Sequence, residues 1–196
     1  MAQNNLYPIF LKLENLQTLL VGAGNVGLEK LTAFLKNSPK AKITIVAEYV
    51  CDEVSEMVRN NEHVRLIKRK FFTSDLEGKD LLILATDDHD LHKRIKLVAK
   101  EKRILTNVAD TPDLCDFYLG SVVQKGDLKI GISTNGKSPT FAKRFREYLE
   151  EFLPDSLQEL VDNLHKFRNS LRGDFQYKVN ALNELTSSFI SKKPIV

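Results

Sequence analysis

Three glycines near the start of the chain, Gly22, Gly24 and Gly27, have the spacing of a phosphate cradle. In a turn between a strand and a helix, the first glycine permits the tight turn and the second lets the backbone approach a pyrophosphate. The third lets the helix pack closely on the strand, and the helix then offers free N–H groups and the positive end of its dipole. The spacing therefore favours a nucleotide site over a purely structural glycine turn.

An acidic residue follows the next apolar segment, "ITIVA". At the end of the second strand of a dinucleotide-binding unit, an acid holds the ribose hydroxyls of NAD and repels the 2′-phosphate of NADP. Here Ala47 occupies the usual position of that acid and Glu48 comes one residue later. Glu48 therefore favours NAD only weakly, and a solvated strand end is an equal alternative.

The segment "ATDDHD" follows an almost wholly apolar stretch. After the glycine turn and Glu48, it is the third place along the chain where candidate site groups follow an apolar segment. Thr86 and Asp87 are predicted to line the cofactor site, whereas capping of the next helix better explains its other aspartates, Asp88 and Asp90. His89 and His92 lack the spacing of a metal site, so we expect them on a solvated surface and predict no metal.

Asp110 is the last residue of the segment "RILTNVAD", which predicts a strand. A carboxylate at the end of such a strand can abstract a proton from a substrate. The alternative is a turn residue before Thr111 and Pro112, which the residues alone slightly favour. For Asp113 and Asp116, further along the same turn, the structural interpretation is stronger.

Alternating strand and helix patterns must position these groups. Apolar or β-branched segments that predict strands occupy 17–21, 41–47, 63–71, 80–86 and 103–110, and most are separated by helical patterns. This alternation predicts an α/β fold with an open, doubly wound parallel sheet, in which ligands bind at the carboxyl ends of the strands.

After Asp110 the pattern changes. "FYLGSVV" and "LKIGIST" flank the turn "QKGD" and predict a β-hairpin. Ser138 and Pro139 then start an amphipathic helix that ends before Pro154. Its inward side is predicted to hold Phe141, Phe145, Tyr148, Leu149 and Phe152. Beyond Pro154 only helical patterns follow, and the last includes Phe189.

Composition excludes several classes of protein. The net charge of +3 is mild, and no basic stripe is interleaved with aromatic residues, so we predict no nucleic-acid partner. No segment approaches the roughly 18–20 apolar residues that cross a bilayer. The first residues do not form a secretory signal, so we expect a cytoplasmic protein without a membrane partner. Cys51 and Cys115 are expected to be free, buried thiols.

Several segments together resemble the precorrin-2 dehydrogenase / sirohydrochlorin ferrochelatase family of siroheme and corrinoid biosynthesis. The most specific are "YPIF" before the glycine turn, "NVADTP" around Asp110 and "STNGKSP" at the start of the later helix. They occur in the family's order and spacing between about Leu6 and Pro154. Fused relatives carry a methyltransferase domain, which we do not find in this sequence.

The resemblance implies an NAD-dependent oxidation of precorrin-2 to sirohydrochlorin, and some members of the family also insert ferrous iron. It implies that Asp110 is the catalytic residue, which replaces the turn interpretation. It also implies cofactor contacts at Asn25, Val26, Glu48 and Tyr49. Two rival functions stay open: a non-catalytic NAD(H)-sensing module, and a chelatase without dehydrogenase activity.

The resemblance also implies the domain organisation. A Rossmann-type NAD-binding domain would span 1–113, a small α+β dimerisation region 114–153 and a C-terminal helical domain 154–196, in a homodimer. Basic residues near the start of the helix at 139, namely Lys137, Lys143, Arg144 and Arg146, would attract a polycarboxylate tetrapyrrole. The sequence departs from the family at Gly120, where proline is common, and at Thr134, where some relatives carry a modified serine.

Overall fold

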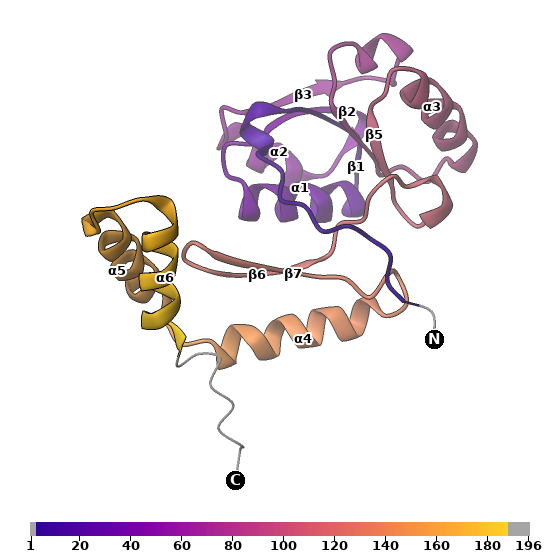
Figure 1. The fold of residues 1–196 in the computed structure, drawn as a ribbon. Helices are drawn as coiled ribbons and strands as arrows, with labels where there is room; N and C mark the ends of the chain where they lie inside the picture. The colour runs from indigo at the N-terminus through magenta and orange to yellow at the C-terminus, as the bar shows by residue number, and fades with distance from the viewer. Residues whose placement is uncertain (1–2, 188–196) are drawn as a thin grey trace. The chain divides into compact units, whose positions relative to one another are not determined.

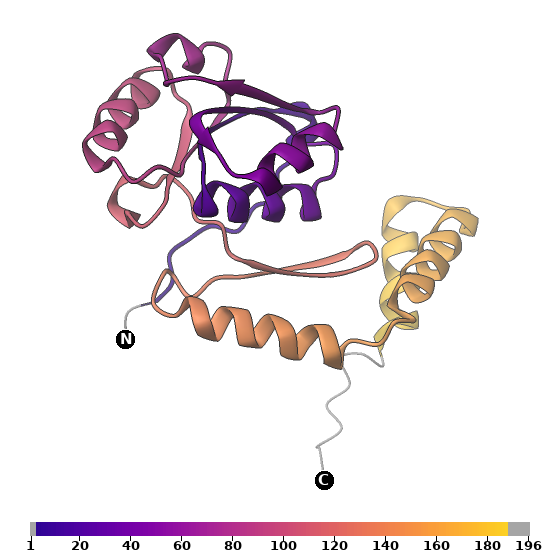
Figure 2. The same ribbon diagram turned by 180° about the vertical axis from the view of Figure 1, so that it is seen from behind.

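The computed structural model describes residues 3–187 and divides into two compact units (Figures 1 and 2). Among the described residues, the first unit comprises 3–121 together with 132–142. The second comprises 122–131 together with 143–187. Phe189 and the rest of the segment 188–196 lie outside the described residues.

A five-stranded parallel sheet forms the centre of the first unit. Its strands are β1 (Gln17–Ala23), β2 (Lys42–Val50), β3 (Val64–Lys68), β4 (Leu81–Leu84) and β5 (Leu105–Val108), in the order β3-β2-β1-β4-β5. The predicted doubly wound α/β fold is confirmed. The order reverses at β1, so the glycine turn that follows this strand lies at the switch point where such sheets bind ligands.

Helices cover both faces of this sheet. They are α1 (Asn25–Asn37), α2 (Asp52–Arg59) and α3 (His89–Glu101), with short 3-10 turns η1 (Leu13–Asn15), η2 (Thr73–Leu76) and η3 (Pro112–Leu114). Leu31 of α1 and Val54 of α2 pack with Ile83 on one face. Ile95 and Ala99 of α3 pack with Leu82 on the other. Burial on both faces explains why β4 reads "LLIL" without a polar residue.

The later elements also match the sequence pattern. They are β6 (Ser121–Lys125) and β7 (Leu128–Ile132), which form a two-stranded sheet, and the helices α4 (Pro139–Phe152), α5 (Leu157–Ser170) and α6 (Phe175–Leu185). Ser138 caps α4 as predicted, because its Oγ accepts a hydrogen bond from the N–H of Phe141 at 3.2 Å. No helix within residues 3–187 is long and apolar enough to span a membrane.

The predicted inward side of α4 is wrong for the single chain. Phe141, Tyr148 and Phe152 are 59%, 57% and 67% exposed, Phe145 is 38% exposed, and Leu149 is half-buried. Ala142 is the one buried residue of this helix. An amphipathic pattern identifies the side of a helix that avoids water, but it does not identify the chain that covers it.

Candidate functional site

The carboxyl ends of the five strands meet at one edge of the sheet because all the strands are parallel. Backbone hydrogen bonds continue past the strands at this edge. The N–H of Ala85 donates to the carbonyl of Val21 at 2.8 Å, and the N–H of Ala109 donates to that of Leu84 at 2.9 Å. Ala85 and Ala109 directly precede Thr86 and Asp110, so the sheet brings these two predicted site residues to the same edge as the glycine turn.

The three glycines of the turn have different surroundings. Gly22 has φ +103°, and a Cβ there would lie 2.3 Å from the carbonyl oxygen of Ala85. A Cβ at Gly27 would lie 2.4 Å from the carbonyl oxygen of Gly22. A Cβ at Gly24 would meet no atom within 4 Å. The chain itself therefore requires Gly22 and Gly27, whereas Gly24 borders open space.

That open space lies at the N-terminus of α1, where Gly24 is the N-cap residue. The first N–H groups of a helix have no partner within the helix, and they carry the positive end of its dipole. Asn25 is exposed, while the side chain of Val26 packs against the core and leaves its backbone N–H for a ligand. These features fit a pyrophosphate.

Glu48 and Tyr49 lie on β2 where its pairing with β1 is irregular. Val21 pairs with Val46, but Ala23 pairs with Val50, so the residues between are displaced from the ladder. Tyr49 is 72% exposed, and the Glu48 carboxylate lies 3.8 Å from the Lys70 ammonium. Both residues therefore lie beside the carboxyl end of β1, free to contact a ligand, whereas Ala47 is buried.

Thr86 follows β4, and its Oγ1 lies 2.9 Å from Nε2 of His92. His92 is only 1% exposed, so the expected solvated position is wrong for this residue. Burial lowers the pKa of His92. The signal was present in the sequence, because His92 shares one side of α3 with Ile95 and Ala99, at positions i, i+3 and i+7.

The other polar residues after β4 lie at the surface. Asp87 and His89 are exposed. The Asp88 carboxylate accepts the N–H of Leu91 at 2.8 Å, which confirms its predicted capping role. Among residues 3–187 no group of three potential metal ligands comes together.

Asp110 lies two residues beyond β5, exposed and with φ +55°. A left-handed conformation is uncommon for a residue other than glycine, and such residues cluster at functional sites. The loop that carries Asp110 is fastened at its far end, where the Asp116 carboxylate accepts the N–H of Thr106 at 2.9 Å and pairs with Lys96. Asp116 therefore has the structural role expected of it.

Both cysteines are free, as predicted. Cys51 is buried, whereas Cys115 is only half-buried, and burial raises the pKa of its thiol. The Cys115 Sγ accepts the N–H of Val108 at 3.2 Å. Cys115 thus holds the loop of Asp110 to the end of β5.

Two of the basic residues expected to attract a polycarboxylate are already paired. Arg144 lies 2.9 Å from Glu147, and Arg146 lies 2.6 Å from Glu150. Lys143 is exposed. The positive charge near the start of α4 is therefore smaller than the sequence suggests.

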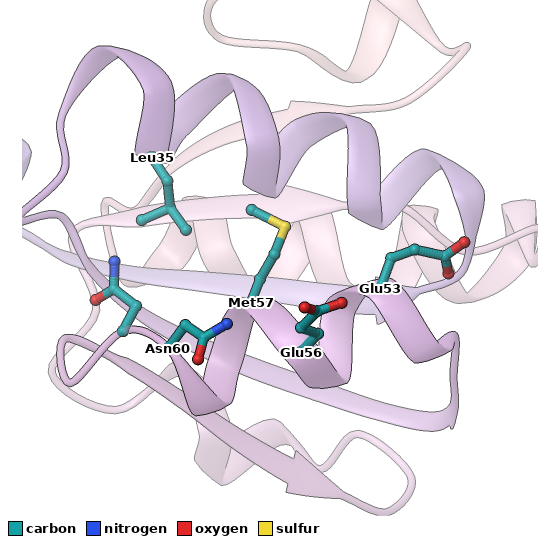
Figure 3. A pocket seen from close by; sticks show the side chains of 6 residues that line it. Leu35, Glu53, Glu56, Met57 and Asn60 are labelled. Atoms are coloured by element: carbon teal, nitrogen blue, oxygen red, sulfur yellow. The ribbon is translucent and has the colours of Figure 1, made fainter.

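A separate hollow of about 380 Å³ lies between α1 and α2 (Figure 3). Figure 3 shows Leu35 from α1 facing Met57, with the carboxylates of Glu53 and Glu56 along one end. None of the predicted site residues lines it. The glycine turn, Thr86 and Asp110 instead share the carboxyl edge of the sheet.

Comparison with known proteins gives two family matches. Residues 9–121 match a family described as putative NAD(P)-binding, and residues 125–151 match the central region of sirohaem biosynthesis proteins. The first match covers the whole sheet and every predicted site residue.

Individual relatives are proteins of sirohaem biosynthesis as well. The siroheme synthase of Vesicomyosocius okutanii is 33% identical over 192 residues, which cover 96% of this chain and 41% of that protein. The siroheme synthase of Pseudoalteromonas atlantica is 36% identical over 169 residues, 86% of this chain and 36% of that protein. The chain thus spans about two fifths of these relatives at most. Among solved structures, one titled SirC, precorrin-2 dehydrogenase, superposes with a TM-score of 0.74 at 26% identity, covering 92% of this chain and 89% of that one.

Proposed function

This chain belongs to the precorrin-2 dehydrogenase family that includes the N-terminal region of siroheme synthase, and on that premise we propose that it oxidises precorrin-2 to sirohydrochlorin with NAD. The observation that carries the proposal is the carboxyl edge of the sheet. It presents an open glycine cradle after β1 and an exposed carboxylate, Asp110, after β5. A module that only senses NAD(H) has no need of that second group.

Different residues along the carboxyl edge of the sheet would hold different parts of the cofactor. The pyrophosphate would lie against the turn and the first residues of α1: Gly22, Gly24, Asn25, Val26 and Gly27. Glu48 and Tyr49 would contact the adenosine ribose, and Thr86 and Asp87 would line the site after β4. When bound, the nicotinamide supplies the hydride acceptor.

Asp110 would act on the substrate as general base. Oxidation of precorrin-2 removes two hydrogens, one as hydride and the other as a proton. An ionised carboxylate can accept that proton, and the exposure of Asp110 leaves it open to a large substrate. The left-handed backbone at Asp110 turns the chain directly after β5, which keeps this carboxylate at the edge of the sheet.

The test is the substitution Asp110→Asn, assayed by the absorbance of NADH formed from precorrin-2 and NAD. Loss of a general base lowers turnover by about 100-fold or more. NADH affinity should not change, because Asp110 is assigned to the substrate. Asp113→Asn, at an exposed carboxylate in the same loop, is the matched control and should keep full activity. Full turnover by Asp110→Asn would exclude its catalytic role.

The same assay on the unaltered chain separates the rival functions. A sensor would bind NADH but would not oxidise precorrin-2. A chelatase without dehydrogenase activity would insert ferrous iron into sirohydrochlorin and form no NADH. NADH formation supports the dehydrogenase.

We further propose a preference for NAD over NADP, supported by the position of Glu48. An exposed carboxylate beside the end of β1 would repel a 2′-phosphate, and Lys70, 3.8 Å away, offsets only part of its charge. Glu48→Gln should bring the apparent KM values for NAD and NADP closer together. An unchanged ratio of the two KM values would count against this role.

A further inference from the structure

His92 is a buried polar group directly behind a residue of the proposed cofactor site. It is 1% exposed, and its Nε2 lies 2.9 Å from Thr86 Oγ1. Its other ring nitrogen, Nδ1, is buried and has no hydrogen-bond partner among the described residues. The ring therefore has one polar contact, at Nε2. Whether His92 donates or accepts in that contact depends on which ring nitrogen carries the proton.

The side chain of Thr86 is held on both of its branches. Its methyl group packs over Gly22, since a Cβ at that glycine would lie 3.0 Å from Thr86 Cγ2. Its hydroxyl oxygen lies against His92. The rotamer of Thr86 is therefore set by the glycine turn on one side and by the imidazole on the other.

The position of the proton follows from the cost of burying a donor. A neutral imidazole carries one N–H. On Nδ1 this N–H would be buried with no acceptor, which is rarer and costlier than an unused acceptor lone pair. On Nε2 it donates to Thr86 Oγ1. The hydroxyl proton of Thr86 then points away from His92, available to another acceptor.

The surroundings of His92 keep the ring neutral. Burial lowers its pKa, and the neighbouring His89 lowers it further, while Asp88 and Asp87 act in the opposite direction. His89, Asp87 and Asp88 are all exposed, so water screens their charges, whereas the burial of His92 is nearly complete.

We propose that His92 is a positioning residue that makes Thr86 a hydrogen-bond donor to the bound dinucleotide. The Nε2–H of His92 donates to Thr86 Oγ1, and the Thr86 hydroxyl donates to an oxygen acceptor of the cofactor. His92 itself does not touch the cofactor. This inference rests on the proposed function, because it takes Thr86 to line the NAD site.

The tautomer can be measured without any nucleotide. Long-range nitrogen–proton NMR of the chain labelled with ¹⁵N distinguishes the two neutral forms of a histidine ring. The proton of His92 is expected on Nε2. A proton on Nδ1 would overturn the proposal, because Thr86 would then donate to His92 and have no proton for a ligand.

The proposed hydrogen bond from Thr86 to the cofactor is tested by measuring the NADH affinity of four variants. NADH is titrated into each variant and its fluorescence is recorded. Thr86→Val removes the hydroxyl but keeps the methyl group over Gly22, and His92→Leu removes the ring. Each should weaken binding about three- to tenfold, the effect of one hydrogen bond. The double variant should bind no more weakly than Thr86→Val, because both changes remove the same bond. His92→Gln, whose amide N–H can replace Nε2–H, should restore most of the affinity.

The control is His89→Gln, at an exposed histidine of the same helix, which should bind NADH like the unaltered chain. Additive losses in the double variant, or unchanged affinity in Thr86→Val, would overturn the proposal. If His92→Leu fails to fold, Thr86→Val and the tautomer still decide it. If the unaltered chain does not bind NADH, the proposed function fails, and the tautomer still settles whether His92 donates to Thr86.

Discussion

At the scale of single residues, the glycine turn separates two roles that look identical in the sequence. Gly22 and Gly27 are required by the fold, because a Cβ at either would lie within 2.5 Å of a backbone oxygen. Gly24 has an ordinary φ of −82° and open space where its Cβ would be. Of the three glycines in this turn, Gly24 is therefore the one that the folded chain does not itself require.

This difference predicts opposite effects of alanine at two of these positions. Gly24→Ala should keep the free energy of unfolding but lose about tenfold or more in NADH affinity, about 1.4 kcal/mol, because its methyl group enters the phosphate space. Gly27→Ala should lower the free energy of unfolding by about 1–3 kcal/mol, since α1 must move away from β1. Fluorescence titration and urea unfolding measure the two quantities. Normal NADH affinity in Gly24→Ala would argue against a phosphate at this turn.

His92 predicts a second effect, on the pH dependence of stability. Burial holds its pKa in the folded chain below the ordinary value of 6.5. Below about pH 6.5 the unfolded chain binds a proton that the folded chain does not, so stability falls as the pH falls from there toward the folded pKa. His92→Gln should remove this part of the loss. Its free energy of unfolding should therefore vary less between about pH 7.5 and pH 5.

Urea unfolding across that range of pH checks the expectation. The neighbours whose charges act on His92, namely His89, Asp87 and Asp88, are unchanged in the variant. His63→Gln, at a histidine with 35% of its side chain exposed, is the control. An equal flattening in both variants would mean that burial of His92 is not the cause.

At the scale of elements, the sequence predicts the sheet well because burial on both faces leaves an unmistakable pattern. The segments "ITIVA" and "LLIL" become β2 and β4, and the glycine turn joins β1 to α1. Asp88 and Ser138 cap their helices as expected. These features depend on local chemistry, which the sequence contains in full.

The features that the sequence did not reveal depend on contacts between distant residues. The irregular pairing of β1 with β2 near Ala23, which displaces Glu48 and Tyr49, has no local signature. From the sequence, His92 is expected on a solvated surface because His89 and His92 lack the spacing of a metal site, although the spacing of His92 from Ile95 is that of a residue on the buried side of α3. The left-handed backbone of Asp110 also has no local signature, and the loop that carries it is fastened to β5 by Cys115 and Asp116.

One connection between elements predicts a measurable loss of stability. Between β3 and β4, the Asp75 carboxylate accepts hydrogen bonds from both Arg69 amino groups, at 2.8 and 2.6 Å, and from the N–H of Phe72 at 2.9 Å. The Asp75 side chain is only 8% exposed. Asp75→Asn should lower the free energy of unfolding at pH 7 by about 1–3 kcal/mol, because a neutral amide replaces a carboxylate that accepts charged hydrogen bonds at a nearly buried position.

The pH dependence gives this prediction a second test. The hydrogen bond from Arg69 holds the pKa of Asp75 below its ordinary value of 3.8. Its contribution is therefore present above that value and is lost as the pH falls through the folded pKa, so the variant and the unaltered chain should converge in acid. Glu77→Gln is the control, because Glu77 is 69% exposed and its pair with Lys102 is a surface pair. A similar loss in Glu77→Gln would contradict the assignment.

At the scale of the whole molecule, α4 carries an aromatic stripe that the single chain does not bury. The rings of Phe145 and Tyr148 stack at 6.3 Å between centroids, and those of Tyr148 and Phe152 at 5.8 Å. These side chains are 38%, 57% and 67% exposed. Contiguous exposed apolar surface of this kind marks an interaction site, and the amphipathic pattern of α4 is that of a helix that packs on a partner.

We therefore propose that the chain forms a homodimer in which the aromatic stripe of α4 is buried. The double substitution of Tyr148 and Phe152 by aspartate should give a monomer in sedimentation equilibrium, because dimerisation would then bury two carboxylates. Its free energy of unfolding should change little at protein concentrations where the unaltered chain is itself monomeric, since both side chains are exposed there. Lys143→Ala, at an exposed residue about 140° around the helix from Tyr148, should leave the dimer intact. An unaltered chain that sediments as a monomer at every concentration would show that this stripe does not pair with its own copy.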